Sequence, residues 1–144
     1  MAGFSVLGIN HVGLAPKDLD KCRWFFGTVL GLASLGEELV KEQKTLTVMY
    51  RSLNKAGGGE SRLEALAPEQ GSTESPIEKF LAKKGAGVHH IALTVDNVDA
   101  AVTSLVSQGV KMIDTVPRSG AHHTRIAFVH PESTGGILVE LVSE

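Results

Sequence analysis

The chain has 144 residues, and 42% of them are hydrophobic, which is enough to form the core of one ordinary domain without disulfide bonds. A net charge of -2 provides no basic surface for nucleic acid, and no apolar run approaches the roughly 18 residues of a membrane span. The only cysteine, Cys22, excludes an internal disulfide and a thiolate metal cluster. Since no apolar leader opens the chain, we expect a cytoplasmic protein with a small-molecule partner.

The first half of the chain predicts a strand, a helix and three further strands. Residues 6–15 are mostly apolar and end at Pro16-Lys17-Asp18, a turn and helix-cap signal. β-like segments follow at 33–41, 44–52 and 61–67, and Gly57-Gly58-Gly59 between the last two predicts a hairpin turn. Between the first strand and these segments, apolar residues recur at helical spacing and stop before Gly31: Leu19, Cys22, Phe26, Val29 and Leu30.

The second half repeats this order after a connector. Ser75-Pro76 predicts a short connector helix at about 75–85, with proline in its first turn. Residues 88–95 then predict a strand, 98–106 a helix closed by Gly109, and 110–116, 124–130 and 136–143 three strands. The order βαβββ therefore occurs twice. We expect one α+β domain over residues 1–144, with module 1 at about 6–68 and module 2 at about 86–144.

The two halves also carry the same chemical groups at matching places. Ile9-Asn10-His11-Val12-Gly13 aligns with Val88-His89-His90-Ile91-Ala92. Near the ends of the halves, Arg62-Leu63-Glu64-Ala65-Leu66 aligns with Leu138-Val139-Glu140-Leu141-Val142. Each half thus begins on a strand that carries a histidine and finishes on a strand that carries a glutamate.

His11, Glu64, His90 and Glu140 are therefore the predicted metal ligands. Successive strand side chains point to opposite faces, so only one of His89 and His90 can share a site with His11, and the repeat selects His90. One glutamate on a strand can simply face solvent. Two glutamates and two histidines at equivalent places are better explained by convergence on one cation. They form a neutral ligand set for a divalent ion such as Co, Zn, Ni, Mn or Fe, and an octahedral ion keeps two positions open.

These features resemble the vicinal oxygen chelate superfamily, which comprises glyoxalases, bleomycin resistance proteins and dioxygenases, and most resemble the methylmalonyl-CoA epimerase family within it. The supporting segments include the two histidine motifs and Pro117-Arg118-Ser119-Gly120-Ala121-His122. The most specific is residues 127–141, from Ala-Phe-Val-His-Pro to Ile-Leu-Val-Glu-Leu. The resemblance implies two tandem βαβββ modules forming a glyoxalase-like curved mixed sheet around a metal cleft.

The resemblance further implies an isomerase that interconverts the stereoisomers of methylmalonyl-CoA by α-proton abstraction through a metal-stabilised enolate. Glu140 is the candidate for one base, Glu64 is a further candidate, and the identity of the second base stays open. Some epimerases carry a non-ligand glutamate base on the third strand, but the matching residue here is Thr47, which cannot act as a base. The resemblance places the substrate beside Thr47 and a loop with the following residues: Arg118, Gly120, Ala121, His122 and His123.

Other functions remain open from the sequence. A lactoylglutathione lyase uses the same chemistry on a glutathione hemithioacetal, and dependence on glutathione would identify it. A non-catalytic small-molecule-binding member of the superfamily would lack the four ligands, and Glu64 argues against a dioxygenase with two histidines and one glutamate. We expect an acyl-CoA substrate and a homodimer. Since the net charge does not attract an anionic substrate, a local basic cluster is a candidate: Lys41, Lys44, Arg51, Lys55 and Arg62.

Overall fold

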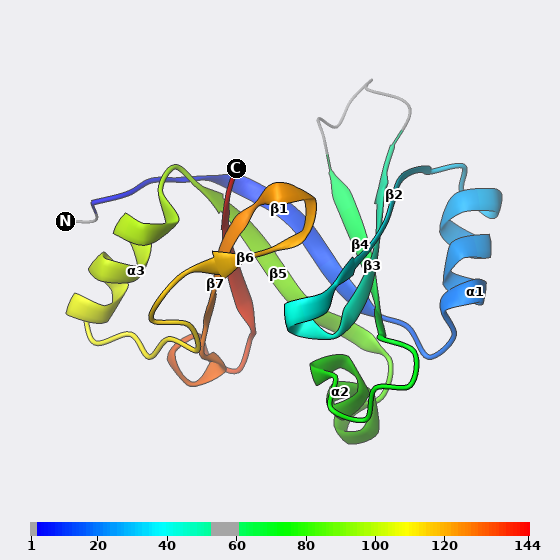
Figure 1. Cartoon of the computed structure of the whole chain (residues 1–144). Helices are drawn as coiled ribbons and strands as arrows, with labels where there is room; N and C mark the ends of the chain where they lie inside the picture. Colours follow the sequence, from blue (N-terminus) through cyan, green and yellow to red (C-terminus); the bar gives the residue numbers. More distant parts are fainter. Residues whose placement is uncertain (1–2, 53–60) are drawn as a thin grey trace. The chain divides into compact units, whose positions relative to one another are not determined.

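The computed structural model describes residues 3–52 and 61–144, so the predicted turn at Gly57-Gly58-Gly59 lies outside the described residues (Figure 1). The chain divides into two compact units, His11–His89 and the combination of Met1–Asn10 with His90–Glu144. The division falls inside the strands β1 (Val6–Ala15) and β5 (Gly87–Val95). No helix in the described ranges is long and apolar enough to cross a membrane.

The unit of residues 11–89 contains a mixed sheet in the order β2 (Ala33–Val40), β3 (Thr45–Arg51), β4 (Arg62–Pro68), β1. β3 is antiparallel to both of its neighbours, whereas β4 is parallel to β1. The helical elements are α1 (Leu19–Arg23), which continues as the π-helix η1 (Trp24–Val29), the 3-10 turn η2 (Lys41–Gln43), and α2 (Pro76–Lys84). The predicted strands and the connector helix are confirmed here.

Both faces of this sheet bury apolar side chains. On one face, α1 and η1 pack against β3 and β4, and the buried members of the cluster are Cys22, Val48, Tyr50 and Ala65. On the other face, α2 packs against β1 and β4 through Ala15, Leu66 and Ile77. The helices therefore leave part of the second face to the side chains at the centres of β1 and β4.

The unit that includes residues 90–144 contains a second mixed sheet, in the order β5, β8 (Val139–Ser143), β7 (Arg125–Val129), β6 (Arg118–Ser119). β5 is parallel to β8, and the remaining pairs are antiparallel. Helix α3 (Val98–Ser107) follows β5, and the 3-10 turns η3 (Ala121–His123) and η4 (Pro131–Ser133) lie before and after β7.

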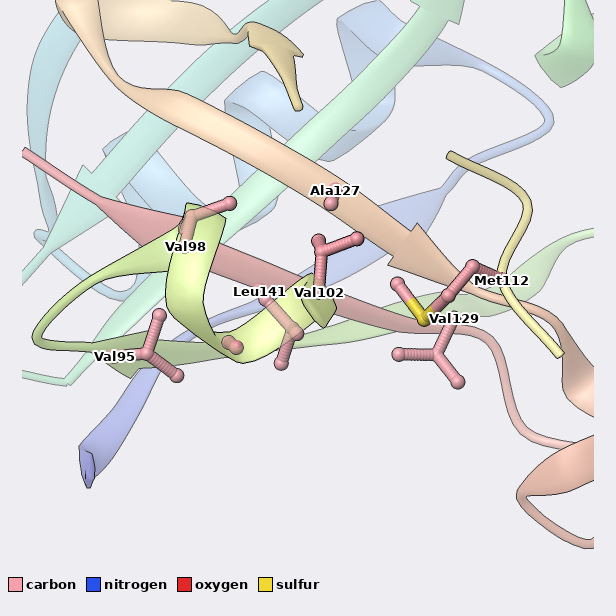
Figure 2. Packing of buried hydrophobic residues seen from close by; sticks show 8 residues of the cluster. Val95, Val98, Val102, Met112, Ala127, Val129 and Leu141 are labelled. Carbon is pink, nitrogen blue, oxygen red and sulfur yellow. The ribbon is translucent and has the colours of Figure 1, made fainter. Parts of the chain in front are cut away.

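Helix α3 covers one face of this sheet. Figure 2 shows Val98 and Val102 of α3 among the side chains of β5, β7 and β8. The strand residues on this face include Val95, Ala127 and Leu141. Because strand side chains alternate, the neighbouring residues form a separate cluster on the opposite face: Ala92, Ile126, Phe128 and Val142.

One predicted element is wrong, and one predicted helix is present but is not α-helical throughout. Residues 110–116 do not form a strand, because Met112 makes only one isolated bridge, with Val129, and Pro117 has no N–H to continue a ladder. On the side of β7 away from β8, the pairing strand is instead the two-residue β6. The predicted first helix is α-helical only to Arg23 and then has the wider π-helical turn.

His89, the histidine that the repeat did not select, is not a surface residue. Its ring is half-buried and lies edge-on to Phe80 of α2, with the ring centroids 4.9 Å apart. Burial lowers the pKa of His89 from its ordinary 6.5 to about 4; the charge of Glu64 opposes this shift, and that of Lys84 adds to it. His89 is therefore neutral at pH 7 in the folded protein.

Replacing Asn97 with alanine is expected to destabilise the protein by about 1 kcal/mol. The Asn97 side-chain oxygen accepts a hydrogen bond from the Ala100 N–H at 3.0 Å and so caps α3. Urea unfolding of Asn97→Ala measures the loss. Ser107→Ala at the exposed end of the same helix is the control, expected to stay within about 0.5 kcal/mol of the unmodified protein. Equal stability of the two variants would contradict the role of the cap.

The stability of the protein is expected to fall as the pH drops from 6.5 toward 4, in part because His89 must take up a proton on unfolding. Because the pKa of His89 is lower in the folded protein than in the unfolded chain, the unfolded chain binds more protons below pH 6.5 and is favoured there. Above pH 6.5 this loss of folding free energy is absent. His89→Gln removes this contribution, so the loss of stability between pH 7 and pH 5 should shrink by about 1–2 kcal/mol. Urea unfolding of metal-free protein at several pH values tests this. An unchanged pH dependence in His89→Gln would contradict it.

Candidate functional site

In the unit of residues 11–89, His11 of β1 and Glu64 of β4 form a buried pair. β1 and β4 are parallel neighbours, and the residue opposite Glu64 is Gly13. His11 lies two residues before Gly13 and therefore on the same face of the strand. Its Nε2 atom is 3.4 Å from Glu64 Oε1, and the two residues are 4% and 5% exposed. A carboxylate at this depth needs a compensating positive charge or strong hydrogen bonds.

The other unit repeats the arrangement with His90 of β5 and Glu140 of β8. These strands are again parallel, and the residue opposite Glu140 is Ala92, two residues after the histidine. His90 Nε2 is 3.5 Å from Glu140 Oε2, and both residues are buried. The predicted repeat is thus visible in both units, because each glutamate lies opposite the residue two positions after the histidine on the neighbouring strand.

The apolar neighbours of the two glutamates fix the direction of the carboxylates. Ala65 belongs to the cluster under α1, and Leu141 belongs to the cluster under α3. Because adjacent strand residues point to opposite faces, Glu64 and Glu140 are directed away from those helices. A shift of one residue in either strand would bring the carboxylate into the apolar cluster, so packing protects the register.

The distance within each pair suits two ligands of one metal ion. A normal N–H···O hydrogen bond spans about 2.7–3.2 Å, so 3.4 and 3.5 Å are long for one. Two ligand atoms at about 2.1 Å from an ion are separated by about 3.0 Å at an octahedral angle and by about 3.4 Å at a tetrahedral angle. Imidazole nitrogen and carboxylate oxygen are also the donors that first-row divalent metals accept. Each pair therefore offers two metal ligands of suitable chemistry and spacing.

Thr47 lies on the same face of the sheet as Glu64. Its partner on β4 is Leu66, and the partner of Glu64 on β3 is Met49. Thr47 is 2% exposed, and its hydroxyl donates a hydrogen bond to the Glu38 carbonyl at 3.1 Å. The hydroxyl proton is thus already used within the sheet, and the oxygen can serve a ligand only as an acceptor.

The predicted substrate loop forms the turn between β6 and β7. The Gly120 N–H donates to the Thr124 carbonyl at 2.9 Å, and the Thr124 N–H donates to the Ala121 carbonyl at 3.2 Å. The two central residues, His122 and His123, have φ values of 56° and 59° and are exposed. This mirror-image turn suits the twist of a hairpin, but it usually contains Asn or Gly at these positions.

The sequence did not single out Phe128 or Asp114, which link this hairpin to the His90 pair. Phe128 is the residue opposite Glu140 on β7, and its ring lies edge-on to the ring of His90 at a centroid distance of 5.7 Å. Asp114 accepts the Phe128 N–H at 2.8 Å and pairs with Arg118 Nε at 3.1 Å. The spacing of four residues between Asp114 and Arg118 was the only available signal for that pair.

The basic cluster suggested by the sequence is only partly described. Lys55 lies outside the described residues, and Lys44 pairs with Glu74 at 3.8 Å. Arg51 and Arg62 are opposite each other on β3 and β4. A joint anion site made by this cluster therefore stays a prediction.

Comparison with known proteins agrees with these features. A family model described as the Glyoxalase/Bleomycin resistance protein/Dioxygenase superfamily matches residues 10–128. The mitochondrial methylmalonyl-CoA epimerase of Bos taurus is 37% identical over 134 residues, which cover 92% of this chain and 72% of the relative. The ethylmalonyl-CoA/methylmalonyl-CoA epimerase of Cereibacter sphaeroides is 33% identical over 135 residues, covering 92% and 95%.

A solved structure gives the same result for the fold. Methylmalonyl-CoA epimerase in complex with methylmalonyl-CoA and NH4+ matches with a TM-score of 0.86 and 36% identity, covering 96% of this chain and 94% of that one. This similarity confirms the expected α+β fold of the glyoxalase type. The chain therefore belongs to the glyoxalase/bleomycin resistance protein/dioxygenase superfamily and, within it, to the methylmalonyl-CoA epimerase family.

Proposed function

We propose that this protein is a metal-dependent epimerase that interconverts the stereoisomers of methylmalonyl-CoA. The observation that carries the proposal is the buried His–Glu pair in each unit, with the same strand offset and nearly the same distance, in a chain related to epimerases. A homodimer in the cytoplasm is part of the proposal, since paired βαβββ modules can assemble within one chain or across two.

In this proposal, one divalent ion is held by four residues, two from each pair: His11, Glu64, His90 and Glu140. Two neutral imidazoles and two carboxylates balance the charge of a divalent ion, which explains why both glutamates can be buried. Co, Zn, Ni, Mn and Fe all accept this donor set. When bound, the ion supplies Lewis-acid stabilisation of the negative charge that develops on the substrate oxygens.

The protein's own task is to move a proton at the carbon between the two carbonyl groups. Epimerisation requires a base on each face of that carbon, because the proton leaves on one side and returns on the other. We assign the two roles to Glu140 and Glu64, since a carboxylate that uses one oxygen as a ligand keeps the second for a proton. Thr47 cannot replace either base, because a neutral hydroxyl has almost no basicity compared with a carboxylate.

A lactoylglutathione lyase would use the same ligands and the same enolate chemistry, so it is the second enzymatic candidate. The similarity to epimerases over 92% of the chain favours the coenzyme A thioester. A non-catalytic binding protein has no need of two buried carboxylate–imidazole pairs, which disfavours that function.

The first test uses a single stereoisomer of methylmalonyl-CoA in deuterated water with metal-loaded protein. We expect deuterium uptake at the α-carbon, together with inversion. Glu140→Gln keeps an oxygen ligand but loses the base, so the rate should fall about 100-fold or more. Glu132→Gln is the matched control, because Glu132 lies in the same unit but is exposed and paired with Lys111. Absence of exchange in metal-loaded protein would overturn the epimerase assignment, and activity that requires glutathione would support the lyase.

The second test measures metal stoichiometry by elemental analysis after exhaustive dialysis. One shared ion predicts one equivalent per chain, and either His11→Ala or His90→Ala should abolish tight binding of that one ion. His130→Ala, a histidine of the β7–η4 junction, should retain it. Two equivalents per chain, each lost with only one histidine, would show that the pairs bind separate ions and would contradict the shared site.

A further inference from the structure

Phe128 is the residue of β7 that adjoins both members of the His90–Glu140 pair. It lies opposite Glu140 in the antiparallel register of β7 and β8, where facing Cβ atoms are about 4.5–5.5 Å apart. Its ring also contacts the His90 ring, with the centroids 5.7 Å apart and an interplanar angle of 84°. Phe128 and His90 are 7% and 3% exposed. One buried aromatic ring is thus a neighbour of both candidate ligands in this unit.

The contact between Phe128 and His90 spans the strand that carries Glu140. β8 lies between β5 and β7, so the backbones at His90 and Phe128 are separated by two strand spacings, about 9.6 Å. Ring centroids 5.7 Å apart therefore require both side chains to lean toward each other over β8. The angle of 84° is the edge-to-face arrangement that aromatic rings favour. The position of each ring consequently limits how far the other can turn.

An imidazole needs such a limit to serve as a metal ligand. Rotation about the Cβ–Cγ bond of histidine has broad energy minima, so covalent geometry alone defines the ring plane poorly. A metal ion binds in the plane of the ring, along the lone pair of one nitrogen, and rotation of the ring directs this lone pair away from the ion. In metal proteins, the groups around the ligands fix this orientation. Phe128 is placed to do so for His90.

The structure holds Phe128 itself at both its backbone and its ring. The Phe128 N–H donates to Asp114 Oδ2 at 2.8 Å, and the Phe128 carbonyl accepts the Ile113 N–H at 2.9 Å. The guanidinium carbon of Arg118 lies 5.7 Å from the centre of the ring. The side chain also belongs to the buried apolar cluster on the sheet face opposite α3. Phe128 therefore offers His90 a ring whose own position is fixed.

The other unit differs at the equivalent place. The residue opposite Glu64 on β3 is Met49, which is 3% exposed. A methionine side chain has three rotatable bonds and adapts its shape to its neighbours, so it offers an imidazole no rigid plane. The histidine and the glutamate thus occur in both units, whereas the residue beside the glutamate is a rigid ring in one and a flexible chain in the other.

We propose that Phe128 is a positioning residue that fixes the plane of the His90 imidazole and thereby prepares the His90–Glu140 pair to bind the metal ion. The inference rests on the metal site of the proposed function, and Phe128 acts through His90. Without the Phe128 ring, the imidazole would have to lose rotational freedom when the ion binds, and this loss weakens binding.

The test titrates metal-free protein with Zn²⁺ in competition with a chromophoric chelator. Phe128→Met introduces the residue found at the equivalent place of the other unit, and we expect it to raise the dissociation constant for Zn²⁺ about 10-fold. Phe128→Tyr keeps the ring and should retain most of the affinity. Ile126→Val removes packing from the same apolar cluster, and Met49→Leu changes the residue beside Glu64. Both of these controls should stay within about twofold of the unmodified protein.

Nuclear magnetic resonance of metal-free protein with ¹³C-labelled histidine tests the orientation of the ring without the metal. The signals of the His90 ring are identified by their loss in His90→Gln. Carbon relaxation should show a restricted His90 ring in the unmodified protein and a more mobile one in Phe128→Met. Equal mobility of the ring in the two proteins would overturn the proposal.

Unchanged Zn²⁺ affinity in Phe128→Met would also overturn the proposal. An equal loss of affinity in Ile126→Val would do the same, because the effect would then belong to the packing of the whole cluster. If the unmodified protein binds no Zn²⁺, the proposed function fails, whereas a more mobile His90 ring in Phe128→Met would still support the positioning role.

Discussion

The burial of two carboxylates is the constraint on which the rest of this structure depends. Glu64 and Glu140 are 5% and 7% exposed, and an ionised carboxylate at that depth costs several kcal/mol unless a positive group or hydrogen bonds compensate it. In each unit the chain meets this requirement in the same way. A parallel strand places a buried histidine on the same face, two residues before the partner of the glutamate. The duplication has thus preserved a local geometry as well as the order of the strands.

The helices contribute to the placement of the glutamates by disfavouring other registers of the strands that carry them. α1 and α3 cover the sheet faces that the glutamates avoid, and they bury Ala65 and Leu141 next to them. A register shift of one residue would exchange an alanine or leucine for a charge in an apolar cluster. The apolar packing of each unit therefore determines which face carries polar chemistry, and β7 adds Phe128 to that face beside His90. The apolar packing under α1 and α3 therefore both stabilises each unit and places the candidate ligands on the opposite face of the sheet.

Much of this could be predicted from the sequence, because the repeat aligns His11 with His90 and Glu64 with Glu140 without any knowledge of the fold. Strand alternation allowed only one of His89 and His90 to share a site with His11, and the repeat selected His90. The missed features depend on distant contacts. Residues 110–116 resemble a strand locally but have one isolated bridge, and Phe128 meets His90 only through the register of three strands. Likewise, apolar spacing could not distinguish the π-helical turn after Arg23 from an α-helix.

The left-handed turn at His122 and His123 has a consequence for how the protein can change over time. Asn and Gly adopt this backbone with less strain, so heat tolerance can be increased here by substitutions that leave every apolar cluster intact. The turn adjoins the strand that carries Arg118, yet both of its side chains are exposed. Substitutions at these two exposed positions can therefore relieve backbone strain without changing the packing on either face of the sheet.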